Sequence, residues 1–167
     1  MKIEIKELPR PAIVAFASRC ARRIAPLFPL SWPYAPTRYK HAVIMAIDSA
    51  EQYTFDAKAA NLANTAAHAA KTTYIAASAA ASAAYNAAKT NDDLALDAMA
   101  EHAYATVAYA YTFIKGTTIQ TDFERLRQTA RKENWTNNTP IPQAFFGPLW
   151  PEGEPDWQAI LDHHDGL

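Results

Sequence analysis

The chain has 167 residues, half of them hydrophobic and a fifth of them charged, and its formal net charge is −1. This composition is typical of a globular domain and excludes a disordered chain. A charge so close to zero gives no reason to expect a nucleic acid or an anionic membrane as partner. The single cysteine, Cys20, excludes an internal disulfide and a thiolate metal cage.

Residues 1–8 alternate weakly between Ile and charged side chains, which fits either a short edge strand or an ordered tail. Acidic residues stand where a signal peptide would need an apolar core. No apolar stretch reaches the roughly 18 residues that a membrane-spanning helix needs. We therefore expect a cytoplasmic protein.

A first helix is predicted to begin at Pro9 and Pro11, because proline in the first turn costs a helix nothing. Apolar residues then recur at helical spacing, at Ile13, Phe16, Ala17, Cys20, Ala21 and Ile24. The other side of this helix carries Arg19, Arg22 and Arg23. On the apolar stripe, Cys20 is interpreted as a small buried hydrophobe rather than as a reactive thiol.

A proline-rich linker follows, with prolines at 26, 29, 33 and 36, and we expect it not to be helical. It carries the large apolar side chains Leu27, Phe28, Leu30, Trp32 and Tyr34. Because so much apolar surface is rarely left in water, the linker is predicted to lie against the rest of the protein.

The stretch 37–115 contains neither proline nor glycine, and 17 of the 32 residues from 57 to 88 are alanine. A run so rich in the strongest helix former is predicted to be helical throughout. A second helix starts near Thr37, with Val43, Ile47 and Ala50 facing inward. Thr54 is the expected N-cap of the third. An unbroken helix from there to residue 89 would be about 50 Å long, so we expect a break at residues 71–73, giving helices near 55–70 and 74–89.

Residues 90–93 are predicted to cap the next helix. One face of that helix carries Leu96, Met99, Ala103, Val107, Ala110 and Ile114, and Gly116 is expected to end it. The spacing from Thr121 to Glu124 fits a capping box that opens a helix running to about residue 134. A second segment rich in proline and aromatic residues completes the chain, with a short last helix predicted from Pro155 to Asp162.

These elements predict an all-α fold, a compact alanine-rich helical bundle of about six helices in a single domain over 1–167. Within it we distinguish an N-terminal tail (1–8), the bundle (9–136) and a C-terminal strap rich in proline and aromatic residues (137–167). Alanine faces permit close helix approach but bury little. Larger side chains are expected to wrap the rim, namely Trp32, Phe145, Phe146, Trp150 and Trp157. Their role is interpreted as structural, a peptide-binding groove being the alternative.

No motif of catalysis or metal binding is present. His41, His68 and His102 lie on three predicted helices and could converge, but the helical spacings of zinc-protease and di-iron sites are missing. Phosphate-binding loops and nucleophile motifs are absent too. We therefore expect no enzyme activity, no catalytic residues, no cofactor and no metal.

Charge is unevenly distributed along the chain. Residues 1–40 carry eight Lys and Arg against two Glu, whereas residues 41–167 carry eight against fifteen acidic residues. The basic part either faces acidic helices within the molecule or is displayed to a partner. One acidic face stands out, formed by Asp93, Asp97 and Glu101 with Tyr104, because like charges four apart destabilise a helix by roughly 0.2–0.5 kcal/mol per pair. This face is either simply solvated or binds a basic protein partner.

Several segments resemble a known family. These are the stretch from Phe16 through Cys-Ala-Arg-Arg to Phe28, the pair Ala46-Ile47, and the run Ala66-Ala67-His68-Ala69-Ala70. Over about residues 12–114 the chain is similar to an all-α family of immunity proteins of bacterial polymorphic toxin systems. The tail from Phe145 to Trp157 is similar to the endings of uncharacterised bacterial proteins. The resemblance implies a cytoplasmic protein that binds and blocks a cognate toxin, without catalytic residues.

These features leave three candidate functions. The first is a non-catalytic immunity protein that neutralises a toxin through protein binding. The alternative is a structural or scaffold protein that forms homo-oligomers through its alanine faces or aromatic segments. The third is an ice-binding helix, since Thr54 and Thr65 are eleven residues apart, but position 76 is alanine and the series ends there.

Overall fold

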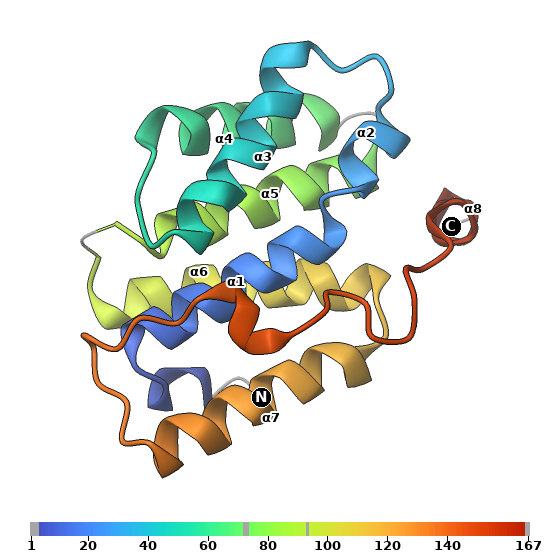
Figure 1. Ribbon diagram of the computed structural model, residues 1–167. Helices are drawn as coiled ribbons and strands as arrows, with labels where there is room; N and C mark the ends of the chain where they lie inside the picture. The colour runs from blue at the N-terminus through green and yellow to red at the C-terminus, as the bar shows by residue number, and fades with distance from the viewer. Residues whose placement is uncertain (1–3, 72–73, 93, 166–167) are drawn as a thin grey trace.

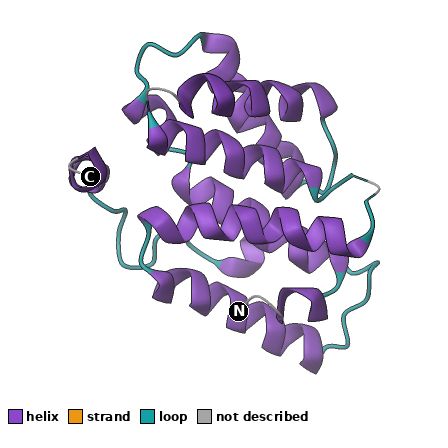
Figure 2. Ribbon diagram, turned by 180° about the vertical axis from the view of Figure 1, so that it is seen from behind, coloured by secondary structure: helices purple, strands orange, loops and turns teal. Residues whose placement is uncertain are grey.

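The computed structural model describes residues 4–71, 74–92 and 94–165. All regular elements within these residues are helices, and no strand occurs among them, which confirms the predicted all-α fold (Figures 1 and 2). The α-helices are α1 (Arg10–Ile24), α2 (Leu27–Ser31), α3 (Thr37–Glu51), α4 (Ala57–Lys71), α5 (Ile75–Lys89), α6 (Leu96–Phe113), α7 (Gly116–Lys132) and α8 (Trp157–Asp165). Two short 3-10 helices, η1 (Glu4–Glu7) and η2 (Gln143–Phe146), precede α1 and follow α7.

The alanine-rich helix α5 lies at the centre of the bundle (Figure 1). It packs against α1, α2, α3, α4 and α6. Its buried side chains are almost all methyl groups, and several of its alanines are completely inaccessible to solvent. Side chains this small let neighbouring helices approach closely on several sides of α5 at once. The predicted break is confirmed, since α4 ends at Lys71 and α5 begins at Ile75.

The larger core side chains come from the surrounding helices. Almost every residue of α1 is buried, and the ring of Phe16 lies 5.5 Å, centre to centre, from the ring of Phe123 on α7. Leu27 and Phe28 of α2 are buried as well, as expected for the linker. Cys20 is fully buried on α1, and this burial raises the pKa of its thiol to about 12. Each fully buried large side chain contributes about 1.5–3 kcal/mol by leaving water.

One prediction about the first forty residues is wrong. The proline linker contains the five-residue helix α2. Pro29 is its third residue, and the first four N–H groups of a helix have no partner within it, so the missing N–H costs nothing there. Of the two alternatives left open for the N-terminus, the structure has an ordered tail and not an edge strand, since residues 4–7 form η1. Ile5 is completely buried and holds η1 on the bundle.

Three predicted helix starts also need correction. At α4 the capping side chain is Asp56, whose Oδ1 accepts a hydrogen bond of 2.9 Å from the N–H of Ala59, while Thr54 bonds back to the Ser49 carbonyl. The next helix, α6, begins at Leu96 and has no side-chain cap, so residues 90–92 do not cap it. Leu96, which was predicted to lie on the apolar face of this helix, is half exposed. Residue 93, the last of that proposed cap, lies outside the described residues.

Gly116 opens α7 instead of simply ending α6. A Cβ atom at this position would lie 2.5 Å from Cε1 of Tyr111, so glycine allows the tyrosine ring to lie against the turn between the two helices. Thr121 stands inside α7, where its hydroxyl bonds to the Thr117 carbonyl 2.8 Å away. The capping-box interpretation of residues 121–124 is therefore wrong.

The C-terminal segment crosses the bundle between α1 and α7 before turning to α8, which packs against α2 (Figure 1). Phe146 and Trp157 are buried, and Trp32, Phe145 and Trp150 pack at the edge of the core, in line with the predicted aromatic rim. Among the described helices, none combines the length and the apolar character needed to cross a bilayer.

Candidate functional site

The acidic residues predicted to bind a partner lie on one exposed stripe of α6. Asp97, Glu101 and Tyr104 follow each other at four- and three-residue spacing, which places them on the same side of the helix. Asp97 and Glu101 are exposed and Tyr104 is partly buried. Asp93, the fourth predicted residue, lies outside the described residues.

Lys6 of η1 meets this stripe, a contact that the sequence analysis missed. Its Nζ lies 2.7 Å from Oδ1 of Asp97. The hydrogen bond and charge of Asp97, followed by the charge of Glu101, raise the pKa of Lys6. Lys6 in turn lowers the pKa of Asp97. The structure therefore brings Asp97, Glu101 and Tyr104 together around a single exposed ammonium group.

Further ion pairs hold η1 in place beside α6. Glu4 pairs with Arg127 at 3.0 Å, and Glu7 pairs with Arg131 at 2.8 Å. Both arginines belong to α7, so η1 is bound to α7 by charge and to α6 through Lys6. Part of the basic N-terminal region thus faces acidic side chains within the molecule, which is one of the two alternatives that the charge distribution allowed.

The hydroxyl group of Tyr104 is buried without a hydrogen-bond partner. Burial also raises the pKa of this phenol. A buried polar group left without a partner costs about 1–3 kcal/mol, and such groups concentrate at sites that become satisfied by a ligand, a water or a partner. Tyr104 is therefore the residue of this stripe at which an additional hydrogen bond would stabilise most.

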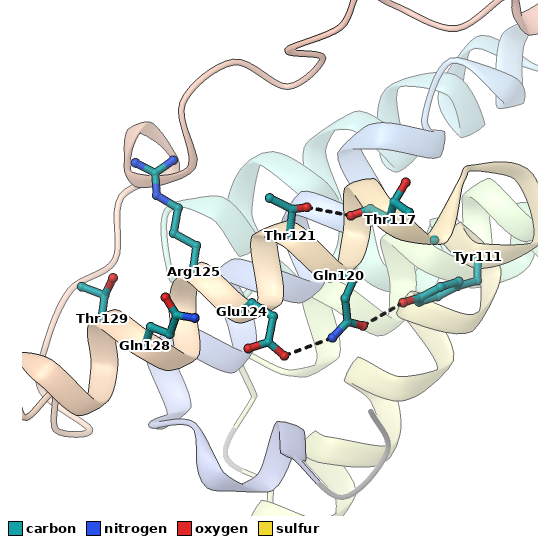
Figure 3. A pocket seen from close by; sticks show the side chains of 9 residues that line it. Tyr111, Thr117, Gln120, Thr121, Glu124, Arg125, Gln128 and Thr129 are labelled. Atoms are coloured by element: carbon teal, nitrogen blue, oxygen red, sulfur yellow. Dashed lines mark hydrogen bonds between the residues drawn. The ribbon is translucent and has the colours of Figure 1, made fainter.

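An open groove of about 750 Å³ continues the stripe toward α7 (Figure 3). Tyr111 donates a 3.4 Å hydrogen bond to Oε1 of Gln120, and Nε2 of Gln120 donates a 3.1 Å bond to Glu124. Figure 3 shows these three side chains pointing toward one another, with Arg125 on the other side of α7. The remaining lining is mostly threonine and glutamine. We refer to Asp97, Glu101, Tyr104, Tyr111, Gln120 and Glu124 together as the α6–α7 face.

A second polar cluster is buried between α1, α7 and the C-terminal segment. The carboxylate of Asp122 accepts hydrogen bonds from both Arg19, at 3.1 Å, and Arg23. All three side chains are at least nine-tenths buried. Burial lowers the pKa of Arg19, and the charge of Arg23 lowers it further, whereas the carboxylate of Asp122 acts in the opposite direction.

The remaining donors of these arginines bind the backbone of the C-terminal segment. Arg19 donates to the carbonyls of Gly147 and Pro148, and Arg23 donates to that of Leu149. Arginine groups also lie over aromatic rings of the same segment, Arg19 over Phe146, Arg23 over Trp150 and Arg125 over Phe145, at 5.0–5.5 Å. We call Arg19, Arg23 and Asp122 the buried arginine cluster. It anchors the C-terminal segment and accounts for a structural role of its rings.

The three helical histidines occupy different surroundings. His41 and His68 are exposed on α3 and α4, whereas His102 on α6 is partly buried, with Nδ1 3.2 Å from Oδ1 of Asn86. Burial, and secondarily the charge of Lys89, lowers the pKa of His102. Within the described part of the chain, no group of three or more His, Cys, Asp or Glu side chains is arranged to hold a metal ion.

Comparison with known proteins gave no matching family model, no matching curated protein and no matching solved structure. The resemblance to immunity proteins therefore stays a prediction. The case for a function depends on the surfaces described above.

Proposed function

We propose that the chain is a non-catalytic protein-binding protein of the immunity type, which binds a basic surface of a cognate toxin through the α6–α7 face. One observation carries the proposal: Asp97, Glu101 and Tyr104 converge on the surface around Lys6. Carboxylates and tyrosines are suited to this task, because tyrosine is enriched in interfaces and complementary charge speeds the encounter of two proteins.

The ion pair between Lys6 and Asp97 is open to exchange. The Asp97 side chain is 84% exposed, and pairs in such surroundings contribute little because water and salt screen them. A lysine or arginine of a partner could therefore take the place of Lys6 at little cost.

The test is co-purification of the tagged protein with the product of the neighbouring gene, followed by calorimetry of the purified pair. Asp97→Lys combined with Glu101→Lys should weaken binding by at least about tenfold, since like charges across an interface cost more than 1.4 kcal/mol. The melting temperature should change little, because both side chains are exposed. A matched control is Glu152→Lys with Asp162→Lys, which makes the same charge change at exposed positions elsewhere.

Equal affinity in the two double variants would show that the α6–α7 face does not bind the partner. If the neighbouring gene encodes no toxin, or if its product does not bind the wild-type protein, the immunity function itself is wrong.

A further inference from the structure

The end of the bundle that contains α2 and the start of α3 lies opposite η1 (Figure 1). Aromatic and apolar side chains are exposed there. The ring of Trp32 lies 6.2 Å from that of Tyr39 and stacks on Tyr74 at 6.3 Å, centre to centre. Tyr34 is 92% exposed, and Ile75, the first residue of α5, is 73% exposed. The partly buried rings thus stand beside the exposed side chains of Tyr34 and Ile75. Large apolar side chains seldom gather on the surface of a monomer without a binding role.

The same end is basic. Residues 24–47 and 57–91 contain no Asp or Glu. Arg38 in the first turn of α3 and Lys71 at the end of α4 are both exposed. The guanidinium of Arg38 lies 4.9 Å above the ring of Tyr39, which holds its charge beside the aromatic cluster. Among the described residues, neither Arg38 nor Lys71 forms an ion pair with a carboxylate, so both charges remain available to a ligand.

We propose that this basic aromatic end, formed by Trp32, Tyr34, Arg38, Lys71 and Ile75, binds an acidic segment of a partner protein in which carboxylates alternate with apolar side chains. Guanidinium groups bind carboxylates through paired hydrogen bonds, and the adjoining rings offer apolar contact area. Tyrosine, tryptophan and arginine are the residues that dominate binding energy in protein interfaces.

A nucleic acid is the less favoured ligand. Tight binding to a phosphate backbone requires several cations along a track, whereas Arg38 and Lys71 stand beside an apolar surface that no phosphate would use. The mixed basic and apolar character matches a segment that is itself both acidic and apolar.

This surface is separate from the α6–α7 face and has the opposite charge. The inference therefore goes beyond the proposed function, and each can fail without the other. Charge reversals at Arg38 and Lys71 leave Asp97 and Glu101 unchanged, so the effect of each pair of substitutions reports on one surface only.

The experiment uses the full-length protein and a fluorescent synthetic peptide of alternating Glu and Leu, with binding followed by fluorescence anisotropy. A Lys–Leu peptide and a short single-stranded DNA are the comparison probes. Arg38→Glu with Lys71→Glu tests the basic groups, and Tyr34→Ala tests the apolar ones without disturbing the core. Lys58→Glu with Lys132→Glu is the matched control, since both lysines are exposed on α4 and α7, away from this end.

We expect the Glu–Leu peptide to bind and the Lys–Leu peptide not to bind. Both test variants should weaken the Glu–Leu affinity by about tenfold or more, and the control should match the wild type. Binding should weaken between about 0.1 M and about 1 M salt, as the screening length falls from about 10 Å to about 3 Å. The proposal is overturned if the control variant loses as much affinity as the test variants, if the Lys–Leu peptide binds equally well, or if the DNA binds more tightly than the Glu–Leu peptide.

Discussion

Replacing Asp122 by alanine tests the buried arginine cluster most directly. The substitution leaves Arg19 and Arg23 buried without the only carboxylate to which either is paired in the described structure. Removing one partner of a buried ion pair typically costs about 3–5 kcal/mol, because the remaining charge stays out of water. Since a domain of this size is stabilised by about 5–15 kcal/mol, Asp122→Ala should lose a large fraction of its stability.

Asparagine at the same position separates charge from hydrogen bonding. Asp122→Asn keeps an acceptor for one guanidinium and loses the negative charge, so its cost should be smaller than that of Asp122→Ala. The matched control is Asp48→Ala. Asp48 pairs with Arg22, but its side chain is 49% exposed and Arg22 keeps a second carboxylate, Glu51, at 2.8 Å. The expected loss for the control is below about 1 kcal/mol.

The assay is urea unfolding followed by far-ultraviolet circular dichroism, with stability extrapolated to water. Thermal unfolding gives an independent measure, in which the loss for Asp122→Ala corresponds to a decrease of about 6–20 °C for a protein of this length. If Asp122→Ala and Asp48→Ala cost the same, the cluster is not a buried charge site and the reasoning fails.

Three further predictions concern other described residues. Cys20, whose pKa is raised to about 12, should react with a thiol reagent only as fast as the protein unfolds, and rapid labelling of the native protein at pH 8 would contradict this. The stability of the protein should also fall as pH rises from about 9 toward 12, because the thiol ionises first in the unfolded chain. His102, whose pKa is lowered, contributes stability that is present above pH 6.5 and lost at lower pH, so His102→Gln should flatten that part of a stability profile relative to the wild type. Gly116→Ala should destabilise by about 1–3 kcal/mol in urea, because the new methyl group would force the Tyr111 ring to move; an unchanged midpoint would show that the ring adapts freely.

Much of the fold could be predicted because it follows from local composition. The absence of proline and glycine over 37–115 predicts helix, and the length limit of a compact domain predicts the break after Lys71. Local signals failed where two interpretations compete. Pro29 is compatible with a first helical turn as well as with a linker, and Thr121 to Glu124 has the spacing of a capping box although it lies within α7.

The contacts of the sites could not be predicted in the same way, because they join residues far apart in the chain. Asp122 binds Arg23 across 99 residues, and Lys6 binds Asp97 across 91. One signal was available for the first pair. Asp122 shares its helical face with the apolar residues Ile119, Phe123 and Leu126, all of them buried, and an acidic residue on an apolar stripe requires a buried cation. No comparable signal marks Lys6, which is one of several surface lysines.

The alanine-rich packing between α4 and α5 determines where another molecule can bind. The buried faces of α4 and α5 consist largely of methyl groups and are used up in packing the helices together. The side chains of the proposed binding surfaces therefore stand on other segments or on exposed positions of these two helices, such as Lys71 at the end of α4 and Ile75 at the start of α5. Arg19, Arg22 and Arg23 are paired internally, so the two proposed surfaces consist of other residues, one acidic set along α6 and one basic set around the start of α3. A central helix built from methyl groups fixes the positions of both surfaces, so substitutions on either can be tested without disturbing the core that separates them.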